Sequence, residues 1–131
     1  MNKVYKRKLN KFDPSTIKEE TTIYIHVQHN NIIITLTNPK GEVIGWLSSG
    51  SIGLRGFRKT SPLAAKLLSF NLFEKIKGFE NKNFKLKIRG FNAIRKALLK
   101  YISLYNIKVI EMEDLTMIPF NGCRPQKRRK L

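Results

Sequence analysis

The chain has 131 residues and a mass of 15.2 kDa, which is enough for one compact domain around a single core. Its 26 Lys and Arg residues face only 9 Asp and Glu residues, and self-repulsion at a net charge of +17 favours a polyanionic partner. We therefore expect nucleic acid, and not a membrane, because no apolar run approaches roughly eighteen residues and the basic segments lack an apolar face.

The positive charge is densest at the two ends and continues into the middle of the chain. Residues 1–11 carry five Lys or Arg residues, and residues 124–131 carry five more. Removing these ten from the total leaves +7 for the middle, so the folded body is also expected to present a basic face. The predicted organisation is a basic N-terminal arm at 1–20, a domain at 21–118 and a basic C-terminal tail at 119–131.

The first part of the domain has the pattern of an antiparallel meander. Apolar and polar residues alternate over 22–28, which is the period of a half-buried strand. A tight turn at Asn30-Asn31 leads into 32–37, whose β-branched residues favour a strand buried on both faces. The segment Asn38-Pro39-Lys40-Gly41 predicts a second turn, and a third strand follows over 42–47.

A glycine-containing loop over 48–59 precedes the first predicted helix. Thr60 or Ser61 can cap this helix, Pro62 suits its first turn, and Gly78 is the predicted stop. Its apolar stripe consists of Leu63, Ala64, Leu67, Leu68, Leu72 and Ile76.

The remaining elements alternate strand, helix and strand. Apolar residues at 84, 86 and 88 alternate with Lys85, Lys87 and Arg89 in a fourth strand, whose outward face is expected to be wholly basic. A second helix over 92–105 should bury Phe91, Ile94, Leu98, Tyr101, Ile102 and Tyr105, and a last strand spans 107–112. The order βββαβαβ predicts a single α/β domain, a mixed sheet flanked by helices with right-handed parallel crossovers.

Two segments are candidate nucleic-acid contacts. The glycines of the 48–59 loop allow backbone N–H groups to approach an anion, and the following helix N-terminus adds partial positive charge. Arg55, Arg58 and Lys59 would then hold phosphates, although a flexible connector with solvated charges is the alternative. The tail at 119–131 should order only against phosphate, its alternatives being a disordered tail or a localisation-type basic patch.

No group of residues predicts catalysis, a cofactor or a small-molecule substrate. The loop lacks the spacing of a nucleotide-binding Walker loop, and the single Cys123 excludes an internal disulfide. Glu111 and Glu113 share one strand face while Asp114 points away, so we interpret this acidic cluster as a solvated strand end. A metal-dependent nuclease needs converging carboxylates and is therefore the weaker hypothesis, as is a free nucleic-acid-binding regulator.

The histidines and aromatic residues do not by themselves predict a catalytic or binding site. His26 and His29 have no Ser, Cys or acid placed to recruit them for catalysis. Tyr24, Trp46 and the phenylalanines could stack on bases, but core packing is the default interpretation for each.

Two long motifs carry a family resemblance. One is Gly53-Leu54-Arg55-Gly56-Phe57-Arg58-Lys59-Thr60-Ser61-Pro62-Leu63-Ala64-Ala65. The other is Asp114-Leu115-Thr116, Ile118-Pro119 and Asn121-Gly122-Cys123-Arg124-Pro125, followed by the Lys/Arg terminus. Together with Ile25-His26, Asn30-Asn31, Trp46 and Ser49-Gly50, the chain resembles the universal small-subunit ribosomal protein numbered eleven, over roughly 21–131.

The resemblance implies a ribonuclease H-like fold without catalytic acids, in a structural constituent of the small ribosomal subunit. It also implies binding to rRNA of the platform (central domain), near the mRNA exit side and beside other platform proteins. Carried over onto matching positions, the family's RNA contacts fall on Arg55, Arg58, Lys59, Asn121, Gly122, Arg124, Lys127, Arg128, Arg129 and Lys130.

One departure from the family concerns the segment between the fourth strand and the second helix. Family members usually carry a Gly-Pro-Gly-rich loop there, where this chain has only Arg89-Gly90-Phe91-Asn92, so contacts made by that loop are not carried over. The shortening, the abundance of residues with AT-rich codons and the lack of an import presequence predict a mitochondrially encoded protein of the mitochondrial ribosome. A bacterial cytoplasm or a plastid is the alternative.

Overall fold

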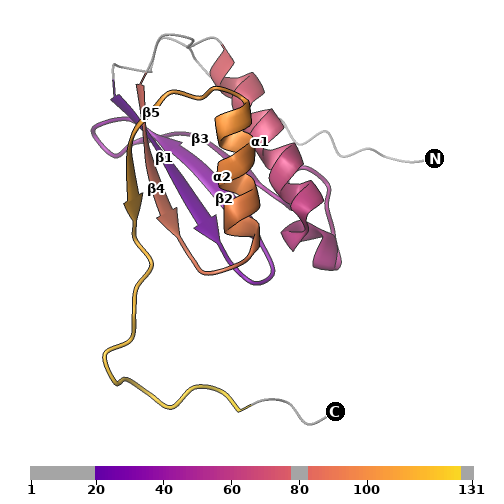
Figure 1. Ribbon diagram of the computed structural model, residues 1–131, viewed down its shortest axis with the longest axis vertical. Helices are drawn as coiled ribbons and strands as arrows, with labels where there is room; N and C mark the ends of the chain where they lie inside the picture. The colour runs from indigo at the N-terminus through magenta and orange to yellow at the C-terminus, as the bar shows by residue number, and fades with distance from the viewer. Residues whose placement is uncertain (1–19, 78–82, 128–131) are drawn as a thin grey trace, which may run out of the picture.

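The computed structural model describes residues 20–77 and 83–127, which form a five-stranded sheet with helices packed against it (Figure 1). The strands are β1 (Glu20–Val27), β2 (Ile32–Thr37), β3 (Val43–Ser48), β4 (Asn83–Arg89) and β5 (Val109–Asp114). The helices are the 3₁₀ helix η2 (Gly56–Thr60) and the α-helices α1 (Pro62–Ile76) and α2 (Ile94–Leu104). The predicted order βββαβαβ and the single mixed α/β domain are confirmed.

The sheet has the strand order β3-β2-β1-β4-β5. The pairs β1–β2 and β2–β3 are antiparallel, as short turns require, whereas β1–β4 and β4–β5 are parallel because helices connect their ends. As a result β1, β3, β4 and β5 all run in one direction, and their carboxyl ends meet at the same edge of the sheet.

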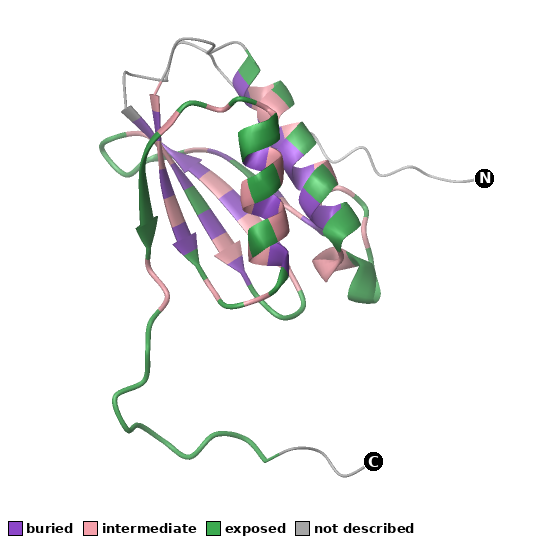
Figure 2. Cartoon of the chain, in the orientation of Figure 1, coloured by how far each residue is buried: buried purple, intermediate pink, exposed green. Residues whose placement is uncertain are grey.

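Within the described residues only one face of the sheet is covered, and α1 and α2 pack side by side on it (Figures 1 and 2). Residues on the helix side of β1 and β4 are buried, while their neighbours along each strand are half-buried or exposed. The prediction that β2 is buried on both faces is wrong: Ile32 and Ile34 are in the core, but Ile33 and Thr35 are half-buried. The reason is that no second layer covers the opposite face in the described parts of the chain.

The first helix begins as predicted. The Ser61 hydroxyl accepts a hydrogen bond from the Ala64 backbone N–H at 3.3 Å, and Pro62 occupies the first turn. Most of the predicted apolar stripe is buried, but Leu63 is 53% exposed because it lies in the first turn, facing away from the sheet. The predicted stop at Gly78 lies outside the described residues.

Several predicted boundaries differ from the structure, by one or two residues in the first and third strands and with larger consequences elsewhere. The second helix begins at Ile94 and not at 92, so Phe91, expected in its buried stripe, lies in the preceding connection and is exposed. The last strand spans 109–114 instead of 107–112, because its limits are set by pairing with β4 and not by its own weak alternation. Part of the predicted 48–59 loop is the 3₁₀ helix η2, which is too short to have a periodic sequence signature.

Candidate nucleic-acid interface

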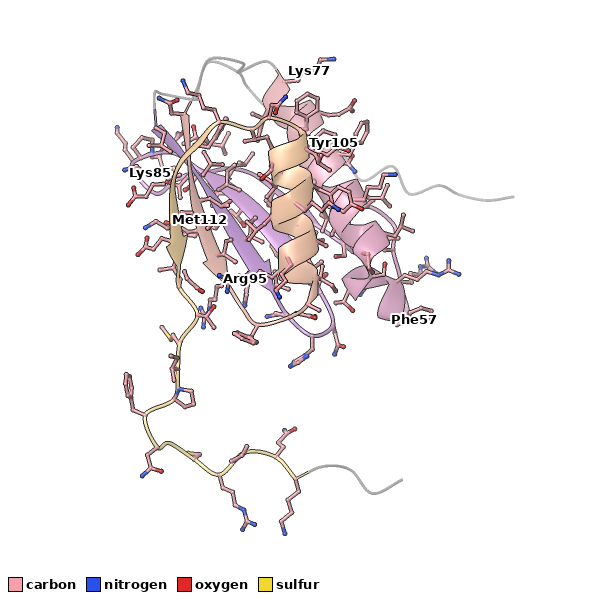
Figure 3. The ribbon with its side chains drawn as sticks, viewed as in Figure 1. Phe57, Lys77, Lys85, Arg95, Tyr105 and Met112 are labelled. Atoms are coloured by element: carbon pink, nitrogen blue, oxygen red, sulfur yellow. The ribbon has the colours of Figure 1, made fainter. Side chains whose placement is uncertain are left out.

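The parallel strands bring several loops together at the carboxyl edge of the sheet. These are the β1–β2 turn at 28–31, the 48–59 segment with η2, the β4–α2 connection at 90–93 and the chain leaving β5 at 115–118. We call this end of the molecule the carboxyl-end surface. Figure 3 shows Phe57 and Arg95 at this end, and Lys77 and Tyr105 at the other. Both segments predicted to bind nucleic acid therefore start from the same end of the fold (Figure 1).

The basic residues of the 48–59 segment project from a well-anchored turn. Arg55 and Arg58 are exposed, and Lys59 is half-buried. The backbone carbonyl of Lys59 accepts a 2.8 Å hydrogen bond from the fully buried Ser49 hydroxyl, and the carbonyl of Arg58 accepts one of 2.8 Å from the Ser61 hydroxyl. These bonds fix the backbone of η2, so the two arginine side chains are presented to solvent from a defined position.

Part of the glycine loop uses its backbone N–H groups in hydrogen bonds of its own. The N–H groups of Ser51, Ile52, Gly53 and Leu54 all donate to carbonyls of residues 48–50 within the loop. These four groups are therefore unavailable to an anion, and a phosphate contact through the other N–H groups of the segment stays a prediction. The exposed side chains of Arg55 and Arg58 are available for such a contact.

A compact polar network ties the start of the tail to the sheet and to α2. The Asp114 carboxylate accepts hydrogen bonds from the Arg95 guanidinium at 2.7 Å and from the Thr116 hydroxyl at 2.7 Å. The Thr116 hydroxyl also accepts a 3.1 Å bond from the Gly90 N–H. Gly90 has a φ of +112°, and a Cβ there would meet the Val27 carbonyl oxygen at 1.9 Å, so only glycine fits this connection.

The same contacts stabilise the charged form of Asp114. Hydrogen bonds from Arg95 and then Thr116 lower the pKa of the Asp114 carboxyl from 3.8 to about 2. Asp114 lies at the exposed end of β5, as the sequence indicates, and its hydrogen bonds also fix the point at which the chain leaves this strand.

The described part of the tail is extended away from the body (Figure 1). Asn121, Gly122, Arg124 and Lys127 are exposed and belong to no helix or strand. Arg128, Arg129 and Lys130 lie outside the described residues, as do residues 1–19 of the predicted N-terminal arm.

The face of the sheet opposite the helices, which we call the open face, is not the wholly basic surface that the fourth strand suggested. Lys85 lies 3.6 Å from Glu111, and Lys87 lies 3.0 Å from Glu113. The hydrogen bond and charge of Glu113 raise the pKa of Lys87, whose ammonium also sits 5.9 Å from the centre of the Tyr24 ring. Opposite charges on β4 and β5 thus largely neutralise each other here.

The same ion pairs bear on the nuclease hypothesis. Glu111 and Glu113 face lysines of β4, whereas Asp114 turns to the other side of the sheet and binds Arg95. Within residues 20–77 and 83–127, no group of three or more His, Cys, Asp or Glu residues could hold a metal ion. In the same ranges no helix has the length and apolar character to cross a membrane.

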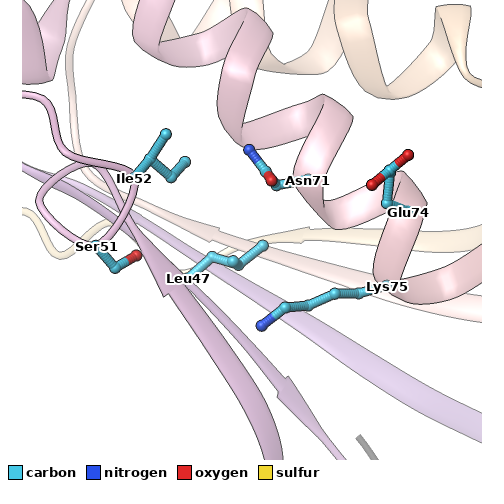
Figure 4. A pocket seen from close by; sticks show the side chains of 6 residues that line it. All are labelled: Leu47, Ser51, Ile52, Asn71, Glu74 and Lys75. Atoms are coloured by element: carbon cyan, nitrogen blue, oxygen red, sulfur yellow. The ribbon is translucent and has the colours of Figure 1, made fainter. Parts of the chain in front are cut away.

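A hollow lies between α1, the end of β3 and the start of the 48–59 segment (Figure 4). It is lined by Leu47, Ser51, Ile52, Asn71, Glu74 and Lys75. The Lys75 ammonium donates to the Trp46 carbonyl at 3.3 Å, and its partial burial lowers the Lys75 pKa. The Asn71 amide donates to the Leu67 carbonyl at 2.8 Å. Lys75 thus connects α1 to the edge strand β3, whereas the Asn71 bond stays within α1.

Aromatic residues divide between the two surfaces. Tyr24 and Trp46 lie on the open face and are 38% and 46% exposed. Phe57, Phe91 and Phe120 are at the carboxyl-end surface or in the tail and are 85%, 88% and 97% exposed. The default interpretation of core packing is therefore wrong for these three phenylalanines, including Phe91, which the periodicity of the second helix predicts to be buried.

Comparison with known proteins identifies the family. The profile of the family described as ribosomal protein S11 matches residues 21–130. The chain is 36% identical over 112 residues to the small ribosomal subunit protein uS11 of Wigglesworthia glossinidia brevipalpis, covering 86% of each chain. It is 35% identical over 108 residues to the protein of the same name from Buchnera aphidicola subsp. Cinara cedri, covering 82% of this chain and 83% of the relative. The chain therefore belongs to the ribosomal protein S11 family.

Proposed function

We propose that the carboxyl-end surface and the tail together bind rRNA in the platform of the small ribosomal subunit, near the mRNA exit side. As a member of its family, the chain is a structural ribosomal protein of the small subunit and not an enzyme. The observation that carries the proposal is that the η2 loop and the tail, both basic, leave the fold at the same end.

The distribution of acidic residues supports this assignment. Among the described residues, Asp114 is the acid at the carboxyl-end surface, and its charge is matched by Arg95. Glu42 lies in the β2–β3 turn and Glu74 near the carboxyl end of α1, both at the opposite end of the fold. An RNA backbone approaching the carboxyl-end surface would thus meet little negative charge, and the counterions released from it would favour binding.

Each part of the interface has an assigned role. Arg55 and Arg58 bind phosphates through their guanidinium groups, and Lys59 adds a positive charge behind them. In the tail, Asn121 and Gly122 form a turn that lies against the RNA, with Asn121 already at a φ of +54°. The tail cations Arg124, Lys127, Arg128, Arg129 and Lys130 follow the phosphate backbone.

The wider setting follows from the family and the composition. The protein would lie beside other platform proteins, with mRNA passing nearby. We assign it to a mitochondrial ribosome because of its shortened β4–α2 connection and its many residues with AT-rich codons, although the relatives compared above are bacterial. A bacterial or plastid ribosome is the alternative location.

Two measurements test the proposal. The native protein should sediment with small ribosomal subunits on a sucrose gradient in high salt, whereas a free pool at the top would contradict it. The purified chain should also bind a fragment of the rRNA central domain more tightly than a fragment of equal length from another domain. Equal affinity for the two fragments would contradict the placement on the platform.

A further inference from the structure

The three most exposed aromatic rings in the described parts of the chain all belong to the proposed RNA-binding region. Phe57, Phe91 and Phe120 are at least 85% exposed, while Tyr24, Trp46 and Phe70 are 38–46% exposed. Single exposed apolar residues are common, but here the most exposed rings share one end of the molecule and its tail. Fold stability does not account for this placement, because rings so exposed contribute little by burial.

The backbone holds Phe57 and Phe91 in fixed positions. Phe57 lies in η2, where the Thr60 hydroxyl donates to its carbonyl at 3.4 Å and Gly56 takes a φ of +57°. Phe91 follows Gly90, whose carbonyl accepts a 3.4 Å bond from Arg95 and whose N–H donates to Thr116. Neither ring needs to be ordered by its own packing, so each is presented to solvent by a rigid segment.

The neighbours of both rings favour RNA over an apolar protein surface. In the chain, Phe57 lies between Arg55 and Arg58, and Phe91 is two residues from the exposed Arg89. A flat ring beside guanidinium groups suits a nucleotide, since the base can stack on the ring while the cation binds the phosphate.

We propose that Phe57 and Phe91 stack on unpaired bases of the rRNA, with Phe120 adding a third ring when the tail binds. This inference rests on the proposed function and specifies its ligand as single-stranded or bulged nucleotides. Bases within a duplex present no free face to such rings, whereas an unpaired base of any identity does. The rings therefore confer a preference for unpaired RNA and little preference for sequence.

Binding of the full chain to an unstructured oligoadenylate, and to a duplex of equal length, tests this inference. Phe57→Leu or Phe91→Leu should weaken oligoadenylate binding by about five- to a hundredfold, the range for loss of one stacked base. Duplex binding and the slope of log affinity against log salt should not change, because no charge is removed. Phe57→Trp should bind oligoadenylate at least as tightly as the wild type, because its ring is larger.

Phe70→Leu is the matched control. This ring lies on α1 with its centre 6.2 Å from that of Tyr105, at the opposite end of the fold, so its loss should not alter RNA binding.

Unchanged oligoadenylate affinity in both Phe57→Leu and Phe91→Leu would overturn the inference. So would a defect confined to assembly with other ribosomal proteins, which would identify a protein partner. Arg58→Ala separates the two proposals: its failure to weaken RNA binding would contradict the proposed function itself.

Discussion

The carboxyl-end surface and the open face of the sheet carry similar residues but differ in charge. Both have cations and aromatic rings: Arg55, Arg58 and Phe57 at the carboxyl end, Lys87 and Tyr24 on the open face. On the open face each lysine of β4 faces a glutamate of β5, whereas Arg55 and Arg58 have no acid near them in sequence. The number of basic residues in a segment therefore does not predict an RNA-binding surface; the pairing of strands also matters.

Removing the tail should have the largest effect on RNA binding. Truncation after Gly122 should lower affinity for the rRNA fragment on the order of a thousandfold or more, because several charge-assisted contacts are lost together. If the tail engages about four phosphates, the slope of log affinity against log salt should become shallower by about 3. Filter binding over a salt series measures both quantities.

The melting temperature provides the control for this truncation. It should stay nearly unchanged, because the described tail residues are exposed and bury little apolar area. Equal affinity and an equal salt slope in the truncated and full-length proteins would show that the body alone recognises RNA.

A single arginine should matter less than the tail but more than a lysine of the open face. Arg58→Ala should weaken rRNA binding by about 1–3 kcal/mol, as for other hydrogen bonds to charged groups. Arg58→Lys should recover only part of this loss where the contact is bidentate. Isothermal titration measures the change.

Lys87→Ala is the comparison on the open face, because this lysine already interacts with Glu113. It should leave rRNA affinity almost unchanged. If Lys87→Ala weakened binding as much as Arg58→Ala, the distinction between the two surfaces would be lost.

Removing a carboxylate from the open face should make that face more like the carboxyl end. In Glu113→Gln, Lys87 loses the acid that it faces, so non-specific RNA affinity should rise a few-fold and the salt slope should steepen by up to about 1. Glu74→Gln makes the same change of charge on α1, away from the sheet face, and should have a smaller effect. Identical behaviour of the two variants would indicate a response to net charge alone.

The smallest effect is expected from the network at the base of the tail, and it should depend on pH. The folded-state pKa of Asp114 is lowered to about 2, so its contribution to stability is present at higher pH and lost as pH falls through that value. Asp114→Asn should therefore melt below the wild type at about pH 5, with the gap closing towards about pH 2. Thermal melts across this range test it, and a constant gap would exclude titration of Asp114 as the cause.

The sequence alone determined the elements and the family. Alternation in β1 and β4, and the Ser61-Pro62 start of α1, depend on local geometry, so they could be interpreted without knowing what packs against them. The long motifs around Arg55 and Asn121 were equally independent of the fold. The candidate residues within them were therefore predicted from sequence, and their roles in RNA binding remain predictions.

The tertiary structure decided which charges and rings are available. Glu113 meets Lys87, 26 positions away in the chain, and Asp114 meets Arg95, 19 positions away, only because β5 pairs with β4 in one particular register. Phe91 was expected in the core, and only the positive φ of Gly90 and the late start of α2 leave it exposed. Sequence patterns report local periodicity, whereas charge neutralisation and exposure depend on which distant segment lies opposite, and that is fixed only when the sheet has formed.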